Sequence, residues 1–172
     1  MPTLTTTRDD HLIAWLTALA ITIHIAESAL PSPLPGIKPG LANVITIAVL
    51  MRYGLRMAVW VALLRVLVGS LLLGTFLSPT FMLSLSGALA STAVLTLGWA
   101  MSRRLRWAAL GPVGYSVLAA VAHMAGQFWI AYTLFIPHPG LLHLLPVLMT
   151  AAVSFGVVSG IITAAMLEKL SV

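Results

Sequence analysis

The chain has 172 residues, of which 60% are hydrophobic and 8% are charged, and its formal net charge is +5. A composition this apolar excludes an aqueous globular fold, and the chain lacks the ten-residue alternation of an outer-membrane barrel strand. Helices that span a lipid bilayer are the remaining way to satisfy the backbone.

Charge and cysteine content narrow the functional classes further. Membrane proteins carry excess Lys and Arg on cytoplasmic loops, which explains the positive charge better than nucleic-acid binding does. The chain has no cysteine, so neither a disulfide nor a thiolate can contribute.

Six apolar segments follow one another along the chain. A helix needs roughly 20 residues to cross the hydrocarbon, and only the second segment is clearly shorter. Short segments often mark binding sites in transport proteins. We predict an all-α integral membrane protein with six transmembrane helices in a single domain, residues 1–172. In chain order the segments are His11–Leu30, Leu41–Met51, Met57–Phe76, Thr80–Met101, Ala109–Phe135 and Leu141–Leu167.

The first segment is predicted to be a retained span. A cleaved signal peptide would have a basic leading region and a cleavage site of small residues. Here Asp9 and Asp10 acidify the leading region, and Glu27 stands among bulky neighbours.

Basic residues are distributed unevenly over the predicted connections. With the N-terminus in the cytoplasm, seven basic residues fall on the cytoplasmic side and Lys38 alone falls outside. We therefore predict that both termini are cytoplasmic and that the protein lies in the inner (cytoplasmic) membrane. The seven are Arg8, Arg52, Arg56, Arg103, Arg104, Arg106 and Lys169.

The first outer loop is rich in proline. Between Ala26 and Asn43 it holds four prolines and two glycines, which exclude a continuous helix. It also places Glu27, Lys38 and Asn43 between two apolar segments. We predict a shaped loop that forms the lid and rim of a binding site.

Further polar residues lie inside the predicted spans. His24, Glu27, His123 and Gln127 fall in the outer half of the membrane when the helical rise is counted from the inner ends. Arg65 is predicted to lie deeper, as the floor of a substrate site that neutralises an anionic group. The alternative is a structural Arg65 that caps carbonyl groups or pairs with one acid.

The histidines raise the question of a metal site. His24, His123, His138 and His143 with Glu27 offer enough donors for zinc, nickel or cobalt. Their spacing matches no compact metal motif, so we predict neither a metal nor another cofactor. Trp129 and Tyr132 fit an aromatic belt at the membrane interface better than a ligand-stacking role.

Small residues recur every four positions in the first and last segments. Such ridges let membrane helices approach closely, either within one bundle or against a partner. The candidates for partner docking are Ala14 and Ala18 in the first segment and Gly156 and Gly160 in the last.

Three sequence blocks carry a family resemblance: Glu27–Pro31 (ESALP), Pro35–Asn43 (PGIKPGLAN) and the stretch from Arg65 through Gly69 to Gly74. They resemble the Gx transporter family, also labelled heptaprenyl diphosphate synthase component I. That family in turn resembles the substrate-capture (S) components of energy-coupling factor (ECF) transporters. The resemblance implies a six-helix bundle that binds a small molecule under outer loops. It also implies docking through the first helix, here Ala14 and Ala18, onto a transmembrane coupling subunit driven by ATPases.

The expected function is capture and transport of a small organic molecule, vitamin-like, flavin-related or isoprenoid. No nucleotide-binding glycine loop is present, so a partner would supply the energy. One alternative is a non-transporting subunit or scaffold of a biosynthetic or redox complex, and a transition-metal transporter is a weaker one. The chain is not expected to be an enzyme, because prenyl chain elongation needs aspartate-rich magnesium motifs and only Asp9 and Asp10 are adjacent.

Overall fold

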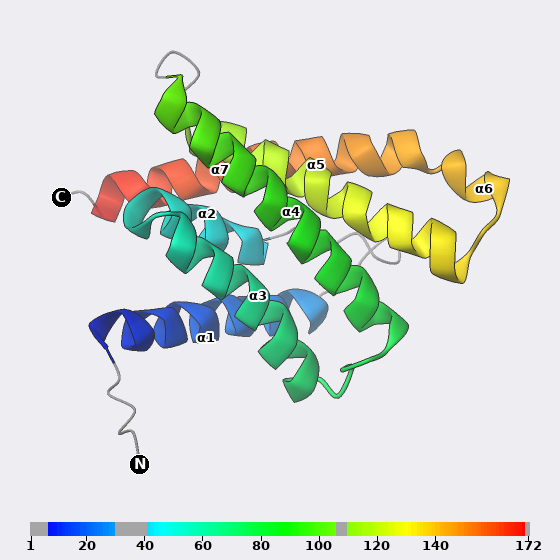
Figure 1. The fold of residues 1–172 in the computed structure, drawn as a ribbon, viewed down its shortest axis with the longest axis horizontal. Helices are drawn as coiled ribbons and strands as arrows, with labels where there is room; N and C mark the ends of the chain where they lie inside the picture. Colours follow the sequence, from blue (N-terminus) through cyan, green and yellow to red (C-terminus); the bar gives the residue numbers. More distant parts are fainter. Residues whose placement is uncertain (1–6, 30–40, 106–109, 171–172) are drawn as a thin grey trace.

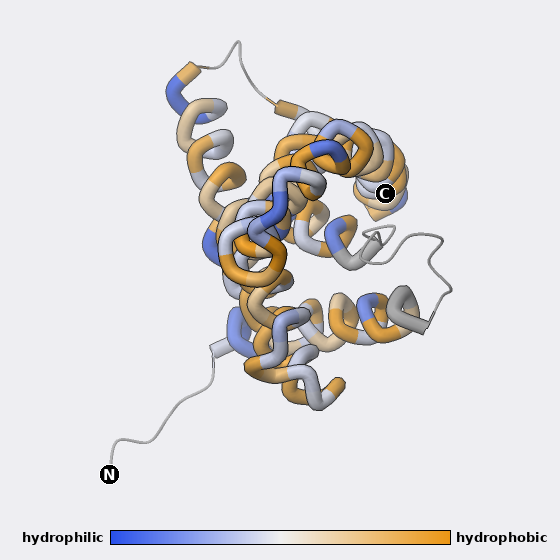
Figure 2. The backbone as a smooth tube through the Cα atoms, turned by 90° about the vertical axis from the view of Figure 1, so that its right-hand side faces the viewer, coloured by the Kyte–Doolittle hydropathy of each residue, from blue (hydrophilic) through white to orange (hydrophobic). Residues whose placement is uncertain are grey.

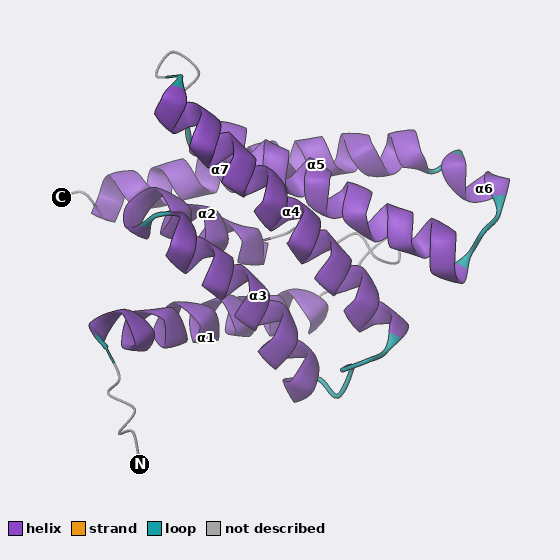
Figure 3. Ribbon diagram, viewed as in Figure 1, coloured by secondary structure: helices purple, strands orange, loops and turns teal. Residues whose placement is uncertain are grey.

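The computed structural model describes residues 7–29, 41–105 and 110–170. Every regular element within these ranges is a helix (Figures 1 and 3). In chain order the elements are α1 (Arg8–Ala29), α2 (Leu41–Tyr53), α3 (Leu55–Leu72), α4 (Pro79–Arg104), α5 (Pro112–Ile130), the π-helix η2 (Ala131–Phe135), α6 (Pro139–Leu142) and α7 (Leu145–Leu170).

The long helices run up and down through one bundle. The start of α1, the α2–α3 turn, the end of α4 and the end of α7 all lie on the left in Figure 1. We call this the arginine-rich end; it carries Arg8, Arg52, Arg56, Arg103 and Arg104. The start of α1 and the end of α7 therefore lie on the same side of the bundle, as the sequence predicts. The assignment of that side to the cytoplasm remains a prediction.

The membrane class follows from the length and composition of the helices. Among the described residues, four stretches are long and apolar enough to cross a membrane: Leu55–Leu72, Pro79–Arg104, Pro112–Phe135 and Pro139–Leu170. In Figure 2 the orange of hydrophobic residues recurs along all the helices, and the strong blue of hydrophilic residues is confined to short stretches. The all-helical fold of the described residues is confirmed, and four of its helical stretches suit a membrane, whereas the count of six spans remains a prediction.

The short helix α2 lies inside the bundle. It has 13 residues, and every residue from Val44 to Leu50 is buried. Its neighbours are α1, α3, α5 and α7, so protein encloses the middle of α2, while Arg52 and Tyr53 at its end are exposed. A helix that is apolar all round is expected in such a core.

Glycines bring α4, α5 and α7 into close contact. A Cβ on Gly126 of α5 would stand 2.7 Å from the backbone oxygen of Ser86 on α4. On α7, a Cβ at Gly156 would stand 2.9 Å from Cα of Val117, and one at Gly160 would stand 2.5 Å from Cα of Val113. These glycines allow backbone-to-backbone packing that no larger residue permits.

The prediction that Gly156 and Gly160 form a partner-docking face is therefore wrong. Both residues are buried and face α5 of the same chain, so they present no surface to another protein. Both glycines pack inside the bundle, which is the alternative that the same spacing also predicted. Ala14 and Ala18 differ, because both are exposed on α1.

Two turns require unusual backbone conformations. Gly54 alone separates α2 from α3, and its φ of 90° with ψ of 179° is a conformation essentially restricted to glycine. Between α3 and α4, Leu77 also has a positive φ, of 62°. Ser78 then caps α4, its hydroxyl accepting a hydrogen bond from the Phe81 amide at 3.3 Å, and Pro79 begins the helix.

Candidate functional site

Two polar side chains of α5 lie against a glycine of α4. A Cβ at Gly87 would stand 2.8 Å from Cε1 and Nε2 of His123 and 2.9 Å from Cγ of Gln127. The His123 side chain also forms a hydrogen bond with the backbone of Gly87. The absence of a side chain at position 87 thus creates the space in which the imidazole lies.

Two further side chains approach from α1 and α3. Cδ2 of His24 lies 4.0 Å from the Cβ position of Gly69 on α3. Arg65, one helical turn from Gly69, and His24 both act electrostatically on His123. We call His24, Arg65, His123 and Gln127 the polar cluster; its members come from three helices.

Arg65 lies beside the other members of the polar cluster. It is ten residues into α3, and His123 is eleven residues into α5. Because both helices start at the arginine-rich end, the two residues lie at similar depths of about 15 Å. The charge of Arg65 acts on His123, and the position of Arg65 as the floor of the site stays a prediction.

The polar cluster has the chemistry of an anion site. An arginine keeps its positive charge in proteins, and an imidazole or a carboxamide can donate or accept hydrogen bonds. A cation among apolar helices is costly unless an anion, a dipole or water faces it. His24 and Arg65 both make interactions within the chain, so a ligand would add to these contacts or replace them.

The structure gives less information on the other predicted site residues, Asn43, Lys38 and Glu27. Asn43 lies in the first turn of α2 and is half-buried. The next residue, Val44, accepts a hydrogen bond from Thr163 of α7 at 3.5 Å. Lys38 and the side chain of Glu27 lie outside the described residues, so the lid remains a prediction.

The histidines do not assemble into a metal centre in the described part of the chain. Within these residues, no group of three or more His, Asp or Glu side chains lies close enough to hold an ion. His138 instead caps the short helix α6, its Nδ1 accepting a hydrogen bond from the Gly140 amide at 3.0 Å.

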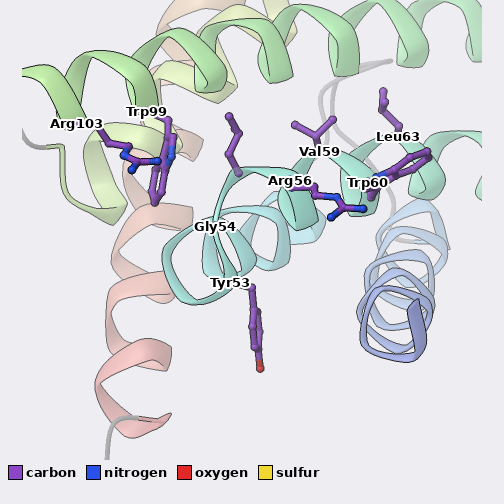
Figure 4. A pocket seen from close by; sticks show the side chains of 9 residues that line it. Tyr53, Gly54, Arg56, Val59, Trp60, Leu63, Trp99 and Arg103 are labelled. Atoms are coloured by element: carbon purple, nitrogen blue, oxygen red, sulfur yellow. The ribbon is translucent and has the colours of Figure 1, made fainter. Parts of the chain in front are cut away.

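A second site lies at the arginine-rich end and was missed by sequence reasoning. A groove of about 700 Å³ runs between the first half of α3 and the last turns of α4 (Figure 4). Its polar lining includes Arg56 and Trp60 from α3 and Trp99 and Arg103 from α4. The detectable signal was an arginine and a tryptophan four residues apart on each helix, because that spacing places both on one face.

Comparison with known proteins identifies one family. Residues 16–166 match the family model described as heptaprenyl diphosphate synthase component I. No match was found among curated proteins or among solved structures.

Proposed function

Since the chain belongs to the heptaprenyl diphosphate synthase component I family, we propose that it is a membrane protein that binds and transports a small organic anion at the polar cluster. The observation that carries the proposal is the convergence of His24, Arg65 and His123 from three helices. In an otherwise apolar bundle, an ionisable group inside a span is by default a functional-site candidate.

Each member of the polar cluster has a distinct role in this proposal. Arg65 neutralises the anionic group of the ligand, since its planar fork suits a carboxylate or a phosphate. His24, His123 and Gln127 supply hydrogen bonds that orient the ligand. Glu27, Lys38 and Asn43 complete the rim and the lid.

Partner docking belongs to the same proposal. Ala14 and Ala18 are exposed on α1 beside Trp15, which is 77% exposed. A ridge of small residues with a large apolar neighbour suits contact with another membrane helix. We propose that a transmembrane coupling subunit with ATPases binds here, in the manner of ECF S components.

A second candidate function follows from the name of the family. A membrane component of heptaprenyl diphosphate synthesis would hold the apolar substrate or product while a partner performs the chemistry. The chain has four acidic residues in all, and prenyl transfer uses clustered carboxylates to hold magnesium. The partner would therefore supply the catalytic carboxylates.

Native mass spectrometry of freshly purified protein tests the binding proposal. The wild-type protein should retain a small organic molecule, and the Arg65→Gln and His123→Ala variants should lose it. Arg104→Gln removes the same charge at an exposed position of α4 and should keep the molecule. Uptake of the identified molecule into proteoliposomes then separates transport from storage.

Two results would overturn the proposal. One is a wild-type protein that retains no small molecule; the other is a retained molecule that persists in both Arg65→Gln and His123→Ala. Isolation of a stable complex with a prenyltransferase subunit, without any bound small molecule, would favour the second candidate function.

A further inference from the structure

The hydrogen bond between His123 and Gly87 determines what the imidazole can offer to a ligand. Gly87 lies well inside α4, so its amide donates within that helix, and its carbonyl oxygen is the group that bonds to the ring. A carbonyl oxygen can only accept, so the ring nitrogen that bonds to Gly87 carries a proton. One N–H of His123 is therefore already used inside the protein.

The second ring nitrogen is the one left for a ligand. In a neutral imidazole one nitrogen donates and the other only accepts. With its donor bonded to Gly87, neutral His123 has a lone pair left, and an anion also presents lone pairs. Only the imidazolium, which donates from both nitrogens, can keep the bond to Gly87 and also bind an anion.

His123 and the other members of the polar cluster are half-buried, so none of them is closed off inside the packed core. Arg65 supplies a charge that does not change with pH, because a guanidinium stays protonated in proteins. An imidazole ordinarily titrates near a pH of about 6.5. Any change of charge at the polar cluster near neutral pH therefore involves a histidine before it involves the arginine.

Few other ionisable groups are near His123. His24 and Arg65 act on it electrostatically. The helices packed against α5 are α2, α4 and α7, and each carries its ionisable side chains in its last turn, at the arginine-rich end. The tyrosines of α5 and η2 keep their protons up to a pH of about 10. Glu27 follows His24 by three residues in the sequence, and its side chain lies outside the described residues.

We infer that an anion binds the polar cluster together with a proton, which His123 takes up. The inference rests on the proposed function and adds the proton as a second species bound at the same site. No covalent bond to carbon changes: the proton passes from water to the free ring nitrogen on binding and returns to water on release. A proton gradient across the membrane would therefore favour binding on the acidic side and release on the other.

Sulfate is the probe for this linkage, because it stays doubly ionised over the pH range in which histidine titrates. Isothermal titration calorimetry of the purified protein in detergent gives its Kd at a pH of about 5.5 and of about 7.5, on either side of the ordinary imidazole value. One proton taken up per anion changes the Kd by up to about tenfold per pH unit. The wild-type Kd should be about ten to a hundred times higher at the upper pH.

Glutamine variants assign the proton to one ring. His123→Gln keeps an N–H donor for Gly87 but takes up no proton, so its Kd should differ by less than about threefold between the two pH values. His143→Gln removes an imidazole from an exposed position between α6 and α7. That control should keep the wild-type pH dependence.

Nitrogen nuclear magnetic resonance of histidine-labelled wild-type protein tests the same step without a variant. The ring signals of His123 are assigned through their contact with Gly87. When sulfate is added at a pH of about 7, these signals should change from one protonated ring nitrogen to two.

Four results would overturn the inference. They are sulfate that does not bind at the lower pH, a wild-type Kd that is equal at both pH values, a His123 ring that stays neutral in the bound state, and a pH dependence that His123→Gln keeps but Glu27→Gln or His24→Gln loses. A small molecule retained through Arg65 in native mass spectrometry would still support the proposed function. Failure of the proton linkage is therefore distinguishable from failure of the binding site.

Discussion

The imidazole of His123 lies so close to Gly87 that a Cβ on this glycine would stand 2.8 Å from two of its ring atoms. An alanine therefore cannot enter position 87 unless the ring moves. The atoms in the way belong to two side chains that can rotate, His123 and Gln127, and alanine gains up to about 1 kcal/mol of helix propensity over glycine. Gly87→Ala should leave stability nearly unchanged while it displaces His123.

Nuclear magnetic resonance of histidine-labelled protein checks this prediction. The ring signals of His123, assigned with the His123→Ala variant, should shift in Gly87→Ala. Gly111→Ala serves as the control, since a Cβ at Gly111 would meet nothing within 4 Å. Unmoved His123 signals in Gly87→Ala would contradict the contact.

At Gly160, in contrast to Gly87, an alanine is expected to destabilise the protein. Its added Cβ would stand 2.5 Å from Cα of Val113, and backbone atoms cannot rotate away. Overpacking typically costs about 1–3 kcal/mol, which exceeds the propensity gain of about 1 kcal/mol. Gly160→Ala should lower the free energy of unfolding in detergent micelles.

Two further alanine variants allow the loss of stability in Gly160→Ala to be compared with smaller expected losses. Gly156→Ala should cost less, because its nearest backbone atom is 2.9 Å away. Gly114→Ala should cost least, because its Cβ would meet only the flexible side chain of Leu110, at 3.1 Å. A Gly160→Ala protein as stable as Gly114→Ala would show that α5 and α7 are not in this contact.

Composition and the length of the apolar segments were sufficient to predict a helical protein suited to a membrane, because lipid leaves the backbone few alternatives. The direction in which a small-residue ridge faces was not predictable. Gly156 and Gly160 have the same four-residue spacing as Ala14 and Ala18, yet one pair is buried and the other exposed. Spacing defines a face of a helix, and only the neighbouring helices decide what that face contacts.

The depth of Arg65 and the groove between α3 and α4 were likewise not predictable from the sequence of single helices. Counting residues from a predicted boundary carries an error of about two to four residues, so the sequence alone could not fix the depth of Arg65 relative to His123. Arg56 and Arg103 are 47 positions apart in the sequence and line one groove because α3 and α4 are neighbouring helices. Single-helix patterns predicted each arginine at a helix end but not that both line one groove.

Leu77 holds a positive φ of 62° in the α3–α4 turn. This conformation costs a branched side chain about 1–2 kcal/mol, whereas asparagine tolerates it. The side chain is 74% exposed, so little packing is lost on replacement. Leu77→Asn should raise the free energy of unfolding by about 1 kcal/mol.

Leu73→Asn is the control for this turn. Leu73 has a φ of −84° and is 41% exposed, so asparagine relieves no strain there. Chemical denaturation in the same detergent measures all three proteins. Equal stability changes at positions 73 and 77 would assign the effect to polarity rather than to backbone conformation.

The start of α1 should respond to acid through one carboxyl group. Asp10 accepts hydrogen bonds from the Thr7 amide at 2.9 Å and the Thr7 hydroxyl at 2.8 Å, while the Asp10 amide donates to that hydroxyl at 3.3 Å. This is the reciprocal arrangement of a capping box. The hydrogen bonds to the carboxylate hold the pKa of Asp10 below its ordinary value.

The sign of the pH effect follows from this lowered pKa. The carboxylate stabilises the first turn of α1 at all pH values above the unfolded pKa of about 3.9, and this contribution is lost as the pH falls through the lower folded value. The ¹³Cα shifts of residues 8–12 should therefore move toward coil values only in strong acid. Asp10→Asn should abolish this transition, and Asp9→Asn, which leaves the Thr7–Asp10 hydrogen bonds in place, should retain it. A transition that persists in Asp10→Asn would assign the acid response to a different group.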